Sequence, residues 1–182
     1  MAFNVISTTL NRQQEALLSF VVIEILNTWT NFSRAYYLSC ILKPRTVSGK
    51  RIIVLSLIPD FNSAISVAIT HLRPHMTPPA SGIWHRRDEP SWYDHNLLMR
   101  CCRNIGCSNI TDIQAAFSLG SRVFVDLPVF RNFFAHRNSQ TGKAAADLGP
   151  QYGIPATLRP SQILLSSPLG RPQPLILVLC QA

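Results

Sequence analysis

The sequence predicts a mostly helical protein, and three observations lead to this class. Apolar residues repeat at the spacing of one helix face over several long segments between residues 13 and 150. These segments stop at a Gly or a Pro, the residues that most often end helices. Only one short run, residues 51–58, has the β-branched character of a strand. We therefore expect a helical core over residues 13–150, a proline-rich insertion loop at 74–90 and an irregular tail at 151–182.

The size and composition indicate one basic domain that associates with itself. A chain of 182 residues can bury a real core without disulfides or metal, so we expect a single domain, residues 1–182. Charged residues make up 14%, well below the roughly 25% usual in soluble proteins, so we expect part of the surface to be covered. The net charge is +8, and fourteen of the seventeen basic residues are Arg. Arg binds phosphate and stacks on bases, which makes RNA a plausible partner, although a merely soluble basic protein has the same composition.

We expect a cytoplasmic protein that contacts no membrane. Residues 1–14 lack the basic start and apolar core of a secretory signal. Glu24 interrupts the apolar run at 16–26, and prolines break the apolar C-terminus. Five Cys at irregular spacing fit reduced thiols better than a disulfide framework.

The first helix is expected over residues 13–42, where apolar residues repeat until Lys43 and Pro44 stop the pattern. Some 30 helical residues reach about 45 Å, the length of a bundle's central helix. Arg34 lies off the main apolar stripe. It is a candidate for RNA binding, but we favour a solvated or ion-paired Arg at the helix border.

The next part of the chain is expected to alternate between a helix and loops. Residues 51–58 form either an edge strand or a buried helical turn, and periodicity cannot decide between them. Asp60 then caps a helix that stops before the loop at 74–90. This loop contains Trp84-His85-Arg86-Arg87, a combination that can stack on bases and hold phosphates. We favour the alternative in which Trp84 simply fixes the loop to the helices.

Two further helices are expected from Ser91 to Gly106 and from Asn109 to Gly120. They carry four residues of the types that bind metals: His95, Cys101, Cys102 and Cys107. The two adjacent Cys point to different helix faces, and no second pair has structural-zinc spacing. We therefore predict no metal site and no cofactor, and regard the Cys as buried thiols. A zinc-dependent hydrolase remains a third alternative.

The following helix carries the most informative residues. We expect it to run from Asp126, as its N-cap, to about Leu148, with Pro128 in its first turn. Its buried stripe is expected to contain Phe130, Phe133 and Phe134. Arg131 and His136 fall on opposite borders of this stripe, roughly 140° apart. Both are therefore expected at the rim of the packed surface, where polar residues of an amphipathic helix ordinarily lie.

The C-terminal tail differs in character from the rest. Residues 151–182 hold many prolines, few charges and no clear period. We expect extended chain that packs over the helices, with one apolar segment at 175–179.

The segment Arg131-Asn-Phe-Phe-Ala-His136 resembles the signature of the HEPN family, the higher eukaryotes and prokaryotes nucleotide-binding domains. In that family an Arg is followed, after a short spacer, by a His, and the first residue of the spacer is commonly polar, as Asn132 is here. The segment lies on a predicted helix and continues into Arg137-Asn138, which supports the resemblance.

This resemblance implies an all-α, up-and-down bundle that forms a homodimer, with two Arg-His motifs facing each other across the interface. It also implies a metal-independent endoribonuclease of a toxin or defence system, which leaves a 2′,3′-cyclic phosphate. His136 is then the general acid or base and Arg131 the phosphate clamp, while Asn132 positions the phosphate or His136. The candidate substrate-binding residues are Arg137, Asn138 and Arg34.

A second function class fits the same residues. Some HEPN proteins are non-catalytic helical dimers that bind RNA, a nucleotide or a protein partner such as a cognate antitoxin. The angle of about 140° between Arg131 and His136 bears on this choice. A shared phosphate requires Arg131 to reach round the helix, or a second chain to complete the site.

Overall fold

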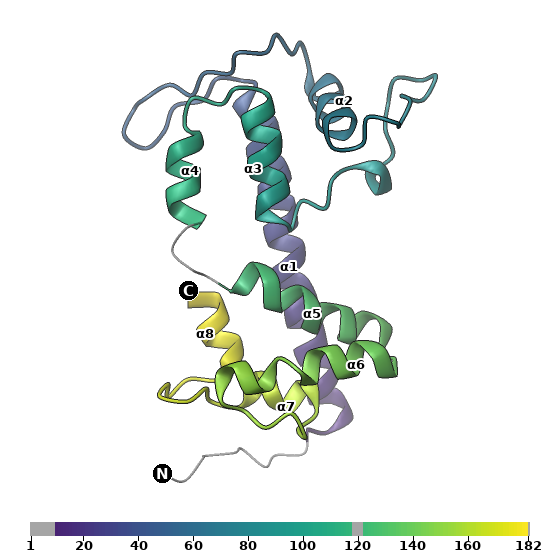
Figure 1. Ribbon diagram of the computed structural model, residues 1–182, viewed down its shortest axis with the longest axis vertical. Coiled ribbons are helices and arrows are strands. Elements are labelled where there is room, and N and C mark those ends of the chain that lie inside the picture. Colours follow the sequence, from purple (N-terminus) through teal and green to yellow (C-terminus); the bar gives the residue numbers. More distant parts are fainter. Residues whose placement is uncertain (1–9, 118–121, 182) are drawn as a thin grey trace. The chain divides into compact units, whose positions relative to one another are not determined.

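The computed structural model describes residues 10–117 and 122–181. These residues form eight α-helices and two 3-10 helices (Figure 1). No strand forms among them, and their one β-type pairing is a single bridge between Arg45 and Arg51. The all-α prediction is therefore confirmed.

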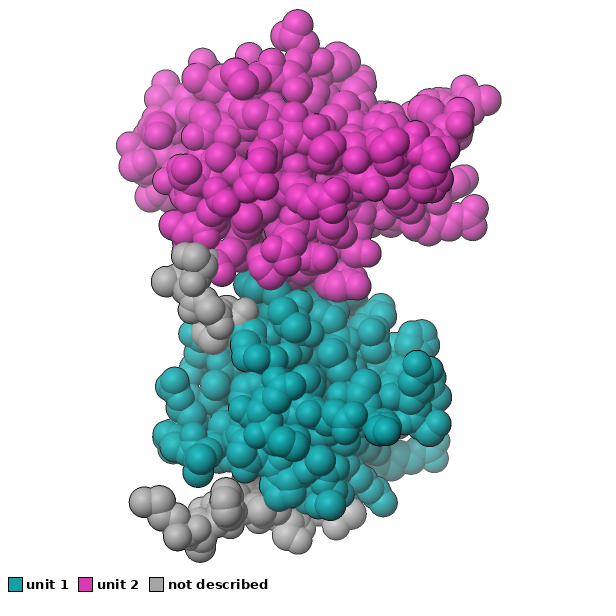
Figure 2. Space-filling model, in the orientation of Figure 1, with its two compact units in different colours: residues 1–27, 120–182 teal, residues 28–119 magenta. Residues whose placement is uncertain are grey.

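The chain divides into two compact units, shown in two colours in Figure 2. Unit 1 comprises residues 1–27 and 120–182, and unit 2 comprises residues 28–119. Each unit has its own hydrophobic cluster. We expected one domain with one core, so the second cluster is a feature that the apolar pattern alone did not reveal. That the two units act as a single domain stays a prediction.

Helix α1 (Arg12–Cys40) contributes residues to both units. Its bounds lie within two residues of the predicted ones, so the long first helix is confirmed. By length and composition alone, α1 is apolar enough to cross a membrane, a test that a core helix of a soluble protein also passes. In each unit, part of α1 is buried in the local cluster: Leu18 and Val22 in unit 1, Tyr37 and Cys40 in unit 2.

Unit 2 continues with α2 (Phe61–Leu72), which begins as predicted. Asp60 Oδ1 accepts a 2.7 Å hydrogen bond from the Ser63 amide, which confirms Asp60 as the N-cap. The buried residues of α2 include Ile65 and Ile69. These side chains anchor α2 in the cluster of unit 2.

The next helix of unit 2, α3 (His95–Asn104), starts four residues later than predicted, because Asp94 is its N-cap. It stops before Gly106, whose φ of 69° is the left-handed conformation that ends helices. Helix α4 (Ile110–Phe117) follows, as predicted. Its predicted end at Gly120 lies outside the described residues.

Residues 51–58 form an irregular segment, and part of its backbone pairs with the turn between α3 and α4. The Ser108 amide donates to the Ile53 carbonyl at 2.8 Å, and the Leu55 amide donates to the Ile105 carbonyl at 3.0 Å. Neither the edge strand nor the helical turn that we expected is present in this described segment. The turn between α3 and α4 takes the place of a partner strand and provides hydrogen-bond partners for backbone groups of this segment.

The proline-rich loop at 74–90 contains only one short element, the 3-10 helix η1 (Arg86–Asp88). The Trp84 side chain is buried in the cluster of unit 2. This burial agrees with the interpretation that Trp84 fixes the loop to the helices.

Unit 1 is completed by the C-terminal half of the chain. Its elements are α5 (Val123–His136), α6 (Ser139–Ala146), η2 (Gly149–Tyr152), α7 (Pro160–Leu165) and α8 (Leu175–Gln181). The predicted single helix from Asp126 to Leu148 is wrong in two respects. It begins three residues earlier, because Asp126 is a buried residue of the first turn and not the cap. It also breaks after His136, where Arg137 adopts a left-handed conformation with φ 46°.

The predicted irregular tail is wrong for much of residues 151–182. Helices α7 and α8 form there, and Leu164 and Leu175 are fully buried in the unit 1 cluster. The prolines open these helices instead of preventing them. Pro160 is the first residue of α7 and Pro174 directly precedes α8, positions at which no intrahelical hydrogen bond is lost.

Candidate active site

The segment with the HEPN-like signature occupies the last two turns of α5. Phe130 and Phe134 are buried in the unit 1 cluster and Phe133 packs against it, which confirms the predicted stripe. Arg131 is half-buried, whereas Asn132 and His136 are exposed. The polar residues therefore lie at the border of the packed face and beyond it, as expected.

Arg131 and Asn132 contact each other directly. Arg131 Nη1 donates a 3.3 Å hydrogen bond to Asn132 Oδ1. This contact holds one edge of the guanidinium and leaves its remaining N–H donors for an external oxygen. Arg131 therefore retains the capacity to bind a phosphate in two-point contact.

His136 is the last residue of α5, and its side chain is exposed. Within the described part of the chain, no hydrogen bond or ion pair engages the imidazole. Both ring nitrogens are thus accessible for proton exchange with a ligand. The C-terminal end of a helix carries partial negative charge. Positive charge for an anionic ligand near His136 therefore has to come from Arg side chains nearby.

Arg137 is fixed by its backbone and by its side chain. Its amide donates to the Phe133 carbonyl at 2.7 Å, which closes the last turn of α5. Its Nη2 donates to Ser19 Oγ of α1 at 2.8 Å, and Ser19 Oγ donates in turn to the Glu15 carbonyl at 2.6 Å. The direction of the chain after His136 is therefore set by a contact to a different helix of the same unit.

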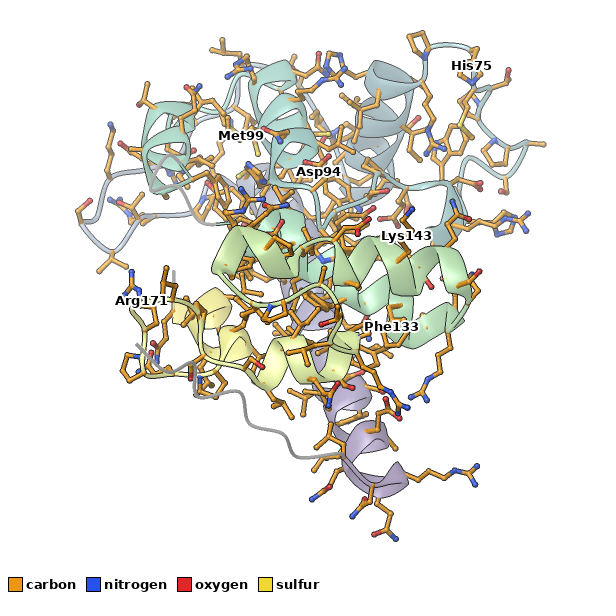
Figure 3. The ribbon with its side chains drawn as sticks, turned by 60° about the horizontal axis from the view of Figure 1, so that its bottom comes forward. His75, Asp94, Met99, Phe133, Lys143 and Arg171 are labelled. Carbon is orange, nitrogen blue, oxygen red and sulfur yellow. The ribbon has the colours of Figure 1, made fainter. Side chains whose placement is uncertain are left out.

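Asn138 has a defined structural role. Its Oδ1 accepts a 2.8 Å hydrogen bond from the Thr141 amide, so Asn138 is the N-cap of α6. Helices α5 and α6 consequently form a hairpin with a connection of two residues, Arg137 and Asn138 (Figure 3, with Phe133 of α5 and Lys143 of α6 labelled). The proposed role of Asn138 in substrate binding stays a prediction.

A buried carboxylate holds the start of α5. Arg122 Nε and Nη2 donate to the two Asp126 oxygens at 2.8 and 3.2 Å, and the Tyr152 hydroxyl of η2 donates to Asp126 Oδ2. Burial and the contact with Asp126 raise the pKa of Tyr152 above its ordinary value of 10.0. This network joins the first turn of α5 to the segment after α6, and it supports the helix that carries Arg131 and His136.

Arg34 lies on the part of α1 that belongs to unit 2. Its Nε and Nη2 donate to the Glu89 carboxylate at 2.7 and 2.9 Å. This geometry agrees with the ion-paired interpretation. Arg131, Asn132, His136, Arg137 and Asn138 share unit 1, whereas Arg34 is part of the other unit.

One cluster of cysteines in unit 2 is not predicted by the sequence analysis. The sulfur atoms of Cys40, Cys102 and Cys107 all lie within 4.8 Å of one another, and all three residues are buried. Cys102 and Cys107 are close in the sequence to His95 and Cys101, whereas Cys40 is 62 positions from Cys102. Nothing in the local spacing marks Cys40 as a partner, so the fold was required to find it.

The comparisons with known proteins give one result. No family model, no curated protein and no solved structure matches this chain. The resemblance to the HEPN family therefore rests on the segment from Arg131 to His136 and on its place in α5.

Proposed function

We propose that this protein is a metal-independent endoribonuclease of HEPN type, with His136 as its proton-transfer residue and Arg131 as its phosphate-binding residue. The observation that carries the proposal is the exposed His136 imidazole at the end of α5, without a partner among the described residues. A general acid or base needs a ring nitrogen that its ligand can reach.

The chemistry follows from these two groups. One imidazole removes the proton from the ribose 2′-hydroxyl, whose oxygen attacks the adjacent phosphorus. Guanidinium groups stabilise the negative charge that builds on the phosphorane oxygens. The bond from phosphorus to the 5′-oxygen then breaks, and a second, protonated imidazole donates a proton to that oxygen. The products are a 2′,3′-cyclic phosphate and a free 5′-hydroxyl.

This mechanism requires two imidazoles, and we assign the second to His136 of another copy of the chain. The angle of about 140° between Arg131 and His136 on α5 favours such a composite site, because one phosphate cannot lie directly over both borders of a single helix. Unit 1 also has an apolar groove of about 380 Å³, and its lining residues Leu17 and Leu177 are exposed. Exposed apolar surface of this kind favours self-association.

A non-catalytic dimer that binds RNA, a nucleotide or a protein partner is the second candidate. It is favoured by the structural use of Arg137 and Asn138, since both residues stabilise the α5–α6 hairpin. Such a protein has no need for an accessible imidazole, so the two candidates differ in what they require of His136.

Expression in a bacterial host separates the two candidates. Induction of the wild-type chain is expected to slow growth, and His136→Ala at the same protein level is expected to restore it. His75→Ala, which removes an exposed histidine of unit 2, is the matched control and is expected to remain toxic. Harmless expression of a wild-type chain that elutes with twice the mass of 20.3 kDa favours the binding protein.

A further inference from the structure

Three thiols meet in the core of unit 2. Cys40, Cys102 and Cys107 are at most 4% exposed, and their sulfur atoms lie within 4.8 Å of one another. All three are free cysteines. Three sulfur atoms around one point are a ligand set for a soft metal ion.

The backbone around this cluster is arranged by two helix ends. Cys40 is the last residue of α1, and Cys102 lies in the last turn of α3. After α3 the chain reverses at Gly106, and the Cys107 amide donates a 3.0 Å hydrogen bond to the Cys102 carbonyl. A side chain at Gly106 is unfavourable, since φ is 69° and a Cβ there would lie 2.8 Å from Leu55. This reversal brings the sulfur atoms of Cys102 and Cys107 together.

The polar surroundings of the cluster fit bound positive charge. Helix C-terminal ends carry partial negative charge, and two of them meet here. The neighbouring Cys101 is equally buried but lies outside the cluster.

We propose that Cys40, Cys102 and Cys107 form a binding site for one thiophilic d¹⁰ cation, Zn²⁺ or Cu⁺, held by three sulfur atoms. A metal–sulfur distance of about 2.3 Å places the corners of a sulfur triangle about 4.0 Å apart. The observed separations, at most 4.8 Å, are close to this value. Cu⁺ accepts three thiolates, whereas Zn²⁺ ordinarily takes a fourth ligand. The shared chemistry is a soft cation that replaces thiol protons.

A cation at this site has a structural role. It links the end of α1 to the end of α3 and to the segment directly after α3, both of which are distant from α1 in the sequence. Binding to the folded chain alone stabilises it by mass action. This role is independent of the proposed ribonuclease, because Arg131 and His136 belong to unit 1.

The test is metal binding by the reduced full-length protein. The metal-free chain is titrated with Zn²⁺ in one arm and with Cu⁺ in the other, each against a coloured chelator, and its melting temperature is recorded by circular dichroism. We expect one ion per chain in at least one arm. At a 100-fold excess of free ion over the dissociation constant, the melting temperature rises by roughly 5–10 °C. Excess chelator is expected to reverse this rise.

Cysteine variants assign the site. Cys40→Ser and Cys107→Ser are expected to weaken binding by roughly 100-fold or more. Cys101→Ser is the matched control, because Cys101 is equally buried and outside the cluster, and it is expected to bind like the wild type. If a variant does not fold, the reversible rise in the melting temperature of the wild type still shows whether the metal ion binds. Failure of both ions to bind the wild type overturns the proposal, as does unchanged binding by the folded Cys40→Ser variant.

Discussion

Arg137 Nη2 donates a 2.8 Å hydrogen bond to Ser19 Oγ, so the residue directly after His136 is tied to helix α1 within unit 1. The backbone of Arg137 is left-handed, with φ 46° and ψ 38°. A non-glycine residue in this conformation is strained by roughly 1–2 kcal/mol. The position therefore combines an unfavourable backbone with a favourable side-chain contact, and both fix the exit of the chain from α5.

Variants of Arg137 separate these two contributions. Arg137→Ala and Arg137→Gly both lose the guanidinium contact, but only glycine relieves the backbone strain. We expect Arg137→Gly to be more stable than Arg137→Ala by about 1 kcal/mol, measured by urea unfolding. Equal stability of the two variants contradicts the left-handed conformation at this position.

The buried carboxylate at the start of α5 is expected to be the most sensitive polar group of unit 1. Asp126→Asn removes the charge that Arg122 contacts and disturbs the acceptor of the Tyr152 hydroxyl. We expect a loss of about 2 kcal/mol in the free energy of unfolding. Asp147→Asn, at the exposed C-cap of α6, is the control and is expected to change it by less than about 0.5 kcal/mol. Similar losses in both variants contradict the assigned network.

Stability is expected to fall at alkaline pH. Burial raises the pKa of three tyrosines above 10.0, namely Tyr36, Tyr37 and Tyr152. Above about pH 10 the unfolded chain loses these phenol protons while the folded chain keeps them, so the unfolded state binds fewer protons and becomes relatively more favourable as the pH rises. Urea unfolding between about pH 8 and pH 11 measures the decline. In Tyr152→Phe the decline is expected to be shallower, and a slope identical to that of the wild type contradicts the assignment.

The composite site makes a prediction about mixed dimers. In a dimer of one wild-type chain and one His136→Ala chain, only one of the two imidazoles that the mechanism requires is intact. We expect such mixed dimers, isolated after co-expression, to cleave RNA about 10²-fold more slowly than the wild-type dimer. Cleavage by verified mixed dimers at about half of the wild-type rate contradicts the composite site, because each chain then acts with its own His136 alone.

The sequence predicts elements well where local chemistry determines them. Asp60 caps α2 because its side chain reaches an amide three residues away, and the Phe stripe of α5 follows from helix periodicity alone. Asp126 has the same residue type as Asp60, but its partners include Tyr152, which is 26 positions away. Only the tertiary fold distinguishes a buried acid of this kind from a cap.

Two other features depend on context in the same way. Arg137 ends α5 without a Gly or a Pro, because its side-chain contact with Ser19 and the capping of α6 by Asn138 offset the strained backbone. The many prolines of the tail predict irregular chain, but Pro160 occupies the first position of α7. A proline in that position favours a helix, and its position is not visible until the helix is known.

Cleavage of a structured RNA by the purified protein in EDTA tests the central proposal most directly. The wild type is compared with His136→Ala and Arg131→Ala, and with the controls His75→Ala and Arg171→Ala, which remove exposed residues outside the α5–α6 hairpin. All five proteins are first shown to be folded. We expect cleavage with 2′,3′-cyclic phosphate ends by the wild type and both controls, and a loss of about 10²–10⁴-fold in His136→Ala and about 10²–10³-fold in Arg131→Ala. Equal cleavage by all five proteins, or none by a dimeric wild type, contradicts the proposed ribonuclease.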